Sequence, residues 1–131
     1  MDTMMMNAMT TDMSGMEEMD MPTMQACMDA CSAAEQAMTI CSTQMMDCAP
    51  ACMNGADMCH TMMRAMMRMD GVTPGAMMSM LDACIAMCQV CMDECAAHAA
   101  ESEICAMCAQ ACQACMDSCM AMKDMMMKAA A

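Results

Sequence analysis

The sequence predicts an all-α protein, an antiparallel four-helix bundle with a disordered Met-rich N-terminal tail, and three observations lead to this fold. Cys and Met recur in alternating steps of three and four residues from position 24 to position 126, the spacing of the inner seam of amphipathic helices. Turn-forming residues and shifts of this phase divide the pattern into four segments. The first 21 residues contain many Met but lack the pattern.

The tail, residues 1–21, mixes Met with Thr, Asn, Asp, Ser and Gly and has neither a helical stripe nor a strand alternation. Such a composition is typical of a flexible segment, so we expect the bundle to occupy residues 22–131. Asp and Glu interrupt the tail, and it has no basic start followed by an apolar stretch. Either no export signal exists or it has already been removed.

The first two helical segments precede the clearest turn in the chain. Residues 24–45 form the first, and Pro22 fits its opening turn because proline is tolerated there. Residues 48–69 form the second, with Asp47 as the expected N-cap. The break between the two helices is therefore expected near residues 43–48.

The third and fourth segments follow a run of turn formers. Residues 70–75, Asp-Gly-Val-Thr-Pro-Gly, end the second helix and start the third, with Thr73 as its N-cap. The third segment covers residues 77–98 and the fourth covers residues 101–126, and a phase shift near residue 102 marks the turn between them. Four helices joined by short connections alternate in direction, which predicts the antiparallel bundle.

Sulfur, and not hydrocarbon, must fill the interior of this bundle. The chain has 33 Met and 15 Cys, no aromatic residue, and only one Leu, three Ile and two Val. Large aliphatic side chains contribute about 1.5–3 kcal/mol each when buried, too little in this number to offset about 1–2 kcal/mol of backbone entropy per ordered residue. All 15 Cys fall on the inner seam, so ordinary packing does not explain them.

The Cys spacing favours a metal over disulfides. Residues four apart on a helix have Cβ atoms about 5–6 Å apart, whereas a disulfide needs roughly 3.5–4.5 Å. Thiolates and thioethers together select copper(I), while zinc prefers Cys and His. Exchange of each thiol proton for one copper(I) ion also keeps the core near neutral, which divalent zinc does not.

Two other classes of function were compared with a copper(I) store. A metallothionein-like zinc or cadmium buffer is the alternative. An enzyme is not indicated, because 15 Cys beside a single His on the seam lack the few activated thiols, the base and the substrate cleft of thiol catalysis.

Three groups of candidate copper ligands follow from the seam. The thiolates are Cys27, Cys31, Cys41, Cys48, Cys52, Cys59, Cys84, Cys88, Cys91, Cys95, Cys105, Cys108, Cys112, Cys115 and Cys119. Antiparallel packing brings thioethers to one mouth of the bundle, namely Met24, Met62, Met66, Met69, Met77, Met122 and Met126. Met38 lies on the first helix, and Met45 and His98 are expected beside thiolates at the opposite end. We expect the thioethers of the mouth and of the tail to aid copper capture.

The longest Cys runs resemble those of the bacterial copper storage proteins. They are residues 84–95, CIAMCQVCMDEC, and residues 105–119, CAMCAQACQACMDSC, both built on CxxxCxxC spacing. The resemblance covers residues 24 to about 122. It implies a four-helix bundle with a Cys-lined lumen that stores multiple copper(I) ions, with each Cys a ligand and no substrate turned over. Ala34 and Met38 depart from the family's pattern, in which Cys often continues on the first helix.

Charge and hydropathy limit the classes of partner that the protein can bind. The net charge of −13, from 17 acidic and four basic residues, excludes nucleic acid, because phosphate binding needs clustered Lys and Arg. The longest uncharged run in the patterned region, residues 104–116, is shorter than the ~18 residues of a membrane span. Copper ions are the expected partners, and a copper donor or acceptor protein and a homo-oligomer stay open. Met on the outer faces, among them Met46 and Met116, do not fit a single lumen, and association between bundles and further copper binding stay open for them.

The cellular location follows from redox chemistry. Many reduced thiols fit the cytoplasm, whereas a Met-rich tail fits an oxidising compartment exposed to copper, since thioethers are less easily lost there than thiolates. We favour an exported, periplasmic protein whose signal has been removed, with the cytoplasm as the alternative.

Overall fold

The computed structural model describes residue 4 and residues 20–130, and it confirms the all-helical four-helix bundle. The helices are α2 (Met21–Ser42), α3 (Ala49–Met66), α4 (Pro74–Ala96) and α5 (Glu103–Ala130), with the short 3₁₀ helix η1 (Met69–Gly71) between α3 and α4. Within the described ranges the chain forms no strand. The expected tail lies almost wholly outside the described residues.

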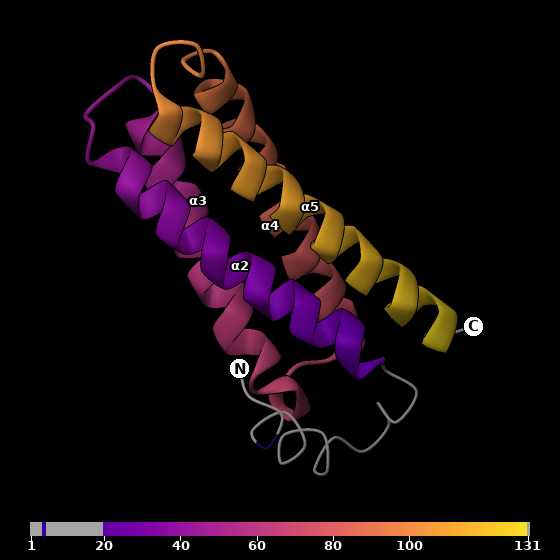
Figure 1. Cartoon of the computed structure of the whole chain (residues 1–131). Helices are drawn as coiled ribbons and strands as arrows, with labels where there is room; N and C mark the ends of the chain where they lie inside the picture. The colour runs from indigo at the N-terminus through magenta and orange to yellow at the C-terminus, as the bar shows by residue number, and fades with distance from the viewer. Residues whose placement is uncertain (1–3, 5–19, 131) are drawn as a thin grey trace.

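The four long helices lie side by side and alternate in direction (Figure 1). Helix α2 packs mainly against α3 and α5, and α4 packs against the same two neighbours. The α2–α3 and α4–α5 turns lie together at one end of the bundle, and the α3–α4 connection lies at the other end, beside the start of α2 (Figure 1). The antiparallel arrangement places the N-terminal ends of α2 and α4 at the same mouth of the bundle.

The helix starts agree with the sequence at two places and differ at a third. Pro22 lies in the first turn of α2, as expected. The Thr73 side chain caps α4, since its Oγ1 accepts a hydrogen bond from the Ala76 backbone N at 3.1 Å. The prediction that Asp47 caps α3 is wrong: Cys48 occupies the N-cap position, and it makes no capping hydrogen bond through its side chain.

The turn between α2 and α3 explains a second difference. Helix α2 ends at Ser42, and Met45 adopts the left-handed backbone region, with φ of 58°. Met45 is therefore 85% exposed, and its expected place on the inner seam is wrong. The three- and four-residue spacing holds only within a helix, so it does not predict the side-chain direction of a residue beyond the end of α2. The next residue, Met46, turns inward and packs against the core.

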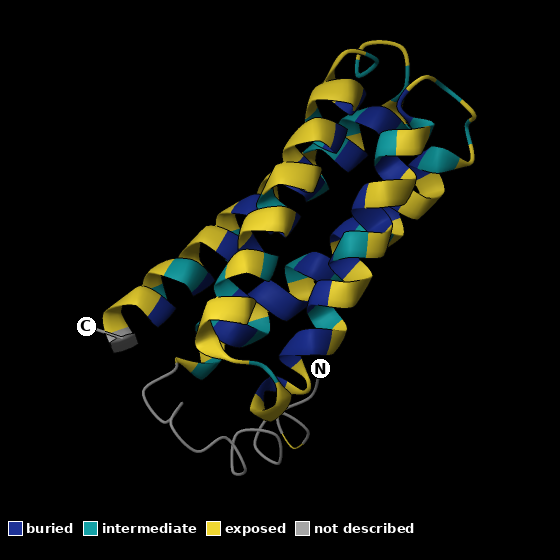
Figure 2. Ribbon diagram, turned by 180° about the vertical axis from the view of Figure 1, so that it is seen from behind, coloured by how far each residue is buried: buried dark blue, intermediate teal, exposed yellow. Residues whose placement is uncertain are grey.

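The core is a sulfur-rich stripe on each helix. Buried positions face the neighbouring helices and exposed positions face outward along the whole bundle (Figure 2). The described residues include no buried polar or charged side chain. Met28 and Met116 are also buried, at 3% and 4% exposure, so the expected outward position of Met116 is wrong. At these positions the buried face of the helix is wider than the seam of three- and four-residue steps, so these side chains also reach the neighbouring helices.

Helix α4 is long and apolar enough to cross a membrane by length and composition, with a mean hydropathy of 1.5. No other described helix meets this criterion. Its buried residues, Met77, Leu81 and four Cys, pack against the rest of the bundle. A core helix of a globular protein can meet the same criterion, so one such helix is weak evidence for a membrane span.

Candidate metal centre

All 15 Cys are buried free thiols, and none is more than 1% exposed. They arise from every long helix because each helix repeats Cys at steps of three and four along its inner face. Their Sγ atoms meet in the space between the helices. The lumen thus brings together the whole set of thiolates that the sequence predicts.

Most of the close thiol pairs join different helices. Cys27 Sγ lies 3.8 Å from Cys119 Sγ, and Cys31 Sγ lies 3.7 Å from Cys115 Sγ. The remaining contacts of 3.4–4.0 Å include Cys52–Cys91, Cys52–Cys95, Cys59–Cys84, Cys59–Cys88, Cys59–Cys115 and Cys91–Cys108. The spacing argument concerned Cys four residues apart on one helix, yet the closest sulfurs face one another across the lumen.

Five groups of thiols are compact enough to hold metal ions, with their Sγ atoms all within 4.8 Å of one another. They are Cys31/Cys84/Cys115/Cys119, Cys41/Cys52/Cys95/Cys108, Cys59/Cys84/Cys88/Cys115, Cys41/Cys48/Cys105 and Cys91/Cys108/Cys112. Four Cys belong to two groups each: Cys41, Cys84, Cys108 and Cys115. The shared Cys link the groups into two sets, and hydrogen bonding between Cys88 of one set and Cys112 of the other joins them into a series along the lumen.

The expected thioether mouth is a closed plug. Its seven Met side chains are between 0% and 6% exposed: Met24, Met62, Met66, Met69, Met77, Met122 and Met126. Leu81, the one Leu of the chain, is buried among the same core residues. Cys27 and Cys119 form the outermost thiol pair toward this end. A metal ion that enters here must displace or pass between thioethers.

The opposite end is closed by the α2–α3 and α4–α5 turns. Gln44 donates hydrogen bonds from Nε2 to Cys105 Sγ at 3.3 Å and to Cys41 Sγ at 3.5 Å. Met46 Sδ lies 3.8 Å from Cys105 Sγ. Sequence reasoning missed Gln44 and Met46, because their positions depend on the shape of a turn.

His98 lies in the α4–α5 turn and is partly buried, with 22% of its side chain exposed. Its Nδ1 lies 3.7 Å from Glu101 Oε2, so its nearest ionic partner is a surface carboxylate. His60 is exposed and pairs with Glu35, with Nδ1 and Oε1 3.0 Å apart. His60 therefore lies on the surface of the bundle, away from the lumen.

Met38 interrupts the thiol series on α2. Its side chain is fully buried and lies against Gly55, where a Cβ atom would be only 2.5 Å from Met38 Sδ. Gly55 therefore leaves the space that Met38 fills. Ala34, one turn earlier, is also fully buried and provides no sulfur. The departures noted on the first helix thus remove thiolates from the α2–α3 side alone.

Hydrogen bonding within the lumen divides the thiols into two kinds. Hydrogen bonding with Cys119 and Cys31 lowers the pKa of Cys27 to about 5. Hydrogen bonding with Cys108, together with burial, raises the pKa of Cys52 to about 12. A thiol that receives S–H hydrogen bonds is stabilised as a thiolate, and the thiols that donate them keep their protons. Closely packed thiolates cannot all ionise together unless cations replace the protons.

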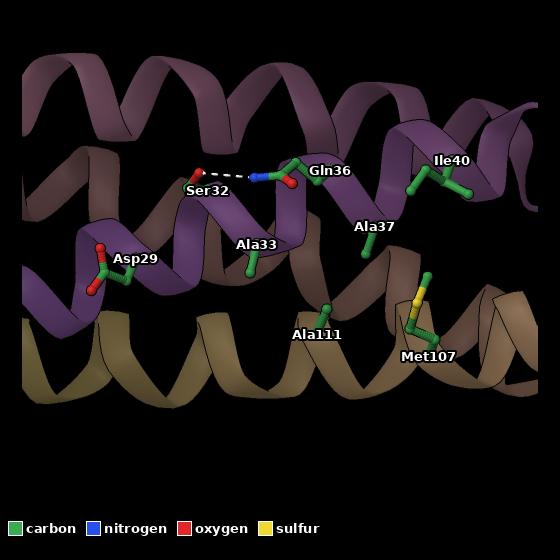
Figure 3. Close-up of a pocket in the computed structure, with 8 residues that line it drawn as sticks. All are labelled: Asp29, Ser32, Ala33, Gln36, Ala37, Ile40, Met107 and Ala111. Atoms are coloured by element: carbon green, nitrogen blue, oxygen red, sulfur yellow. Dashed lines mark hydrogen bonds between the residues drawn. The ribbon is translucent and has the colours of Figure 1, made fainter. Parts of the chain in front are cut away.

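The groove on the outside of the bundle does not belong to the lumen. It lies between α2 and α5, has a volume of about 430 Å³, and is lined mainly by small and polar side chains, as Figure 3 shows. Asp29 contributes the one carboxylate and Met107 the one sulfur of this lining. Metal ligands of the described residues gather in the lumen and not here.

The lumen is suited to a soft, monovalent metal ion. Its donors are thiolates and thioethers, which favour copper(I), and the two His lie at or near the surface. A four-helix bundle with a continuous interior of thiols defines a protein that holds many metal ions at once. The fold and the site together describe a metal store.

Comparison with known proteins identifies the family. The family model described as copper storage protein matches residues 10–124, and the chain belongs to the copper storage protein family. Copper storage and copper as the bound species are thereby confirmed as its function, and the family implies storage and not catalysis. Comparison with individual curated proteins gave no match.

Solved structures of a copper storage protein, Ccsp from Streptomyces lividans, are similar. One, loaded with 10 copper equivalents, has a TM-score of 0.81 at 27% identity, covering 91% of this chain and 98% of that one. A variant with one His replaced by Ala has a TM-score of 0.77 at 29% identity, covering 82% and 98%. A third, with five coppers, has a TM-score of 0.74 at 29% identity, covering 79% and 93%.

The expected export to the periplasm is contradicted by these comparisons. The five-copper structure is of a protein described as a cytosolic copper storage protein from Streptomyces lividans. The expectation rested on the Met content of the tail, but thioethers bind copper in any compartment. The 15 unpaired thiols are the better guide, because a reducing compartment preserves them.

Proposed function

We propose that this chain holds copper(I) on its 15 Cys thiolates and releases it without turning over a substrate. The observation that carries this proposal is the connected series of thiol groups, in which neighbouring Sγ atoms from different helices lie 3.4–4.0 Å apart. Each thiol that binds copper(I) releases its proton to solvent, so loading near one ion per thiol keeps the lumen close to neutral.

An anaerobic titration tests the identity and number of the ions. Copper(I) added from a weak chelator should be taken up to about one ion per Cys, with thiolate-to-copper absorption rising linearly until saturation. A zinc buffer would instead bind about four divalent ions in tetrahedral sets of thiolates. Saturation with a few divalent ions, and weak copper(I) binding, would contradict the proposal. Disulfide turnover with a thiol substrate would support an enzyme.

We further propose that the buried Met plug is the entry for copper(I). Thioethers carry no proton and bind copper(I) more weakly than thiolates, so they can pass an ion onward by ligand exchange. Replacing Met62, Met66 and Met122 with Leu keeps the volume nearly constant, at a cost below about 1.5 kcal/mol per site. Uptake followed by stopped-flow absorption should slow markedly, with the final thiolate-bound stoichiometry almost unchanged.

The matched control for the entry lies at the other end. His98→Ala should leave the uptake rate nearly unchanged and affect at most one ion. A slow His98 variant beside a normal Met-to-Leu variant would place the entry at the turn end. His98 is a proposed ligand of secondary weight, since it belongs to none of the compact groups, and Met38 is one because it offers a thioether and not a thiolate.

The proposed division into a tail, residues 1–21, and a bundle, residues 22–131, has its own test. Deleting residues 1–19 should slow loading or reduce the number of weakly held ions, because this segment offers thioethers and no thiol. Tight thiolate capacity should stay intact. A truncated protein that lost its tight sites would contradict a capture role for the tail.

Copper must also come from and go to other molecules. A copper donor or acceptor protein is part of the proposal, and so is association between bundles. Exposed Met side chains support both, for example Met53, Met120 and Met127, which are 51–58% exposed. Analytical ultracentrifugation of the copper-free and loaded protein measures the second, and a monomer in both states would remove it.

A further inference from the structure

The turn end of the lumen contains a sulfur cluster with its own polar surroundings. Cys41, Cys48 and Cys105 hold their Sγ atoms within 4.8 Å of one another, and each residue is fully buried. Cys41 Sγ lies 3.9 Å from Cys48 Sγ and 3.7 Å from Cys105 Sγ. The three residues come from the end of α2, the start of α3 and the start of α5, so both turns meet at this cluster.

A fourth sulfur completes the cluster. The S–H of Cys105 donates to Met46 Sδ, with the two sulfurs 3.8 Å apart. Met46 is half-buried and packs against the core, whereas the preceding residue, Met45, is 85% exposed. The left-handed backbone at Met45 turns its side chain to solvent and that of Met46 to the cluster. When a copper(I) ion replaces the Cys105 proton, Met46 Sδ already faces it.

A hydrogen-bond network fixes the orientation of the Gln44 amide over these sulfurs. The Cys105 backbone N–H donates to Ser102 Oγ at 3.1 Å, so the Ser102 hydroxyl proton is free to point to Gln44 Oε1, 2.7 Å away. The Oε1 atom is thereby held as an acceptor, and the NH₂ group must face the thiols. Its two N–H bonds point to Cys105 Sγ at 3.3 Å and Cys41 Sγ at 3.5 Å. An amide that donates to a thiolate stabilises its charge.

The charge of the loaded cluster explains why such donors are needed. While fewer copper(I) ions than thiolates occupy the cluster, a net negative charge stays in a site removed from water, and an uncompensated buried charge is costly. The thiol groups deeper in the lumen share Cys84, Cys108 and Cys115 and can share ions, whereas the turn cluster shares only Cys41 with them. The turn cluster lies at the end of the series, where fewer neighbouring ions balance its charge, and there the Gln44 amide supplies positive dipoles.

We propose that Met46 is an additional copper(I) ligand, and that Gln44, oriented by Ser102, is a positioning residue that stabilises the thiolates of a four-sulfur site formed by Cys41, Cys48, Cys105 and Met46. This site closes the turn end of the lumen and holds its ion longer than the groups deeper in the lumen do. The inference deepens the proposed storage function and rests on it.

The first experiment observes Met46 directly. Copper(I) is diamagnetic, so the Met methyl groups of the full chain, labelled with ¹³C, can be followed by NMR as copper(I) is added anaerobically from a weak chelator. Comparison with Met46→Leu and Met45→Leu assigns the two resonances. The Met46 methyl should shift on loading and the Met45 methyl should not. A Met46 resonance that stays in place at saturation would overturn the ligand assignment.

The second experiment measures how slowly the site releases its copper(I) ion. Loaded protein is mixed with an excess of a strong copper(I) chelator, and the slowest phase of removal is recorded. Cys48→Ser should abolish a slow phase of about one ion, which assigns it to this site. Gln44→Leu and Met46→Leu should accelerate that phase on the order of tenfold, the lower end of the effect of residues that support metal ligands. Ser102→Ala should act in the same direction, and Met45→Leu should have no effect.

The outcomes separate this inference from the storage function. Helix content of each variant is checked by circular dichroism, and total stoichiometry should fall by no more than one ion. If the wild-type protein does not load near one copper(I) per Cys, the storage proposal fails before any variant is made. If it loads fully, yet Cys48→Ser removes no slow phase, or Gln44→Leu and Met46→Leu leave that phase unchanged, the proposed site is overturned while storage stands.

Discussion

The two halves of the bundle contribute unequally to the lumen. Helices α4 and α5 supply nine of the 15 Cys, and α2, α3 and the turn between them supply six. On the α4–α5 side the thiols continue without a gap, whereas on the α2–α3 side Ala34, Met38 and Gly55 stand between Cys31 and Cys41 on one helix and between Cys52 and Cys59 on the other. Storage of copper along the middle of the lumen therefore depends more on α4 and α5, while α2 and α3 complete the sites at both ends.

The largest test of this difference removes four thiols from either half. Replacing Cys88, Cys91, Cys108 and Cys112 with Ser eliminates the Cys91/Cys108/Cys112 group and takes one thiol from two others. Replacing four Cys of the other half, Cys27, Cys31, Cys52 and Cys59, with Ser leaves at least three thiols in every group. Anaerobic titration should show a loss of more than four copper(I) ions in the first variant and about four in the second.

Equal losses would mean that each thiol contributes one ion irrespective of its neighbours. The helix content of both variants provides the control, because Ser is close to Cys in size and the same number is introduced into each. A greater loss from the α2–α3 variant would reverse the comparison.

The sequence predicted the fold and the thiol set because both depend on spacing. Steps of three and four place Cys27 and Cys119 on inner faces without knowledge of their neighbours, and short connections fix the helix directions. The partner of each thiol depends on the register between helices, which spacing along one helix does not determine. For this reason the cross-lumen pairs were not foreseen.

The turns mark the other limit of prediction. Met45 was placed by extending the phase of α2, but the helix ends at Ser42 and the chain reverses through a left-handed residue. The same reversal brings Gln44 and Met46 to the Cys105 thiol. No pattern of period three or four encodes these contacts, although two adjacent Met in a predicted turn are a signal that one of them faces inward.

Alkaline pH provides a second test, because Cys52, on α3, forms a hydrogen bond with Cys108, on the other half of the bundle. Its pKa is raised from 9.0 to about 12, first through Cys108 on α5. A raised pKa in the folded state contributes stability that is present below pH 9 and is lost as the pH rises toward 12, since the unfolded thiol ionises first. The copper-free protein should therefore show a falling thermal midpoint between pH 9 and 12 under reducing, anaerobic conditions. Cys52→Ser should flatten this fall.

Copper loading should also remove this dependence on pH, because the proton of Cys52 has then been replaced. Thermal unfolding of the loaded protein over the same pH range is the comparison. An alkaline loss of stability that Cys52→Ser leaves unchanged would show that other thiols carry the effect.

A third test addresses the interruption on the α2–α3 side. Gly55→Ala places a Cβ atom 2.5 Å from Met38 Sδ, and overpacking of this kind costs about 1–3 kcal/mol. Ala is favoured over Gly in a helix by about 1 kcal/mol, so the net loss of stability should be up to about 2 kcal/mol. Gly75→Ala is the control, because nothing lies within 4 Å of its Cβ position; it should be neutral or stabilising.

Combining Gly55→Ala with Met38→Ala sharpens this test. The second substitution leaves a cavity and destabilises by itself, by about 2–5 kcal/mol. If Met38 is what Gly55 accommodates, the additional cost of Gly55→Ala should vanish in that background, as chemical denaturation of the four variants would measure. An unchanged cost would mean that Gly55 is required for a contact other than Met38.

The smallest expected effect concerns how one helix of each half begins. Helix α4 starts with a side-chain cap from Thr73, whereas α3 starts at Cys48 with no such cap. Thr73→Ala should reduce the free energy of unfolding by about 1 kcal/mol, because the Ala76 N–H loses its partner. Asp47→Ala, which replaces the residue that the sequence suggested as the cap of α3, should change it by less than about 0.5 kcal/mol. Chemical denaturation of both copper-free variants measures the difference, and a larger loss for Asp47→Ala would restore that residue as a cap and make the starts of α3 and α4 alike.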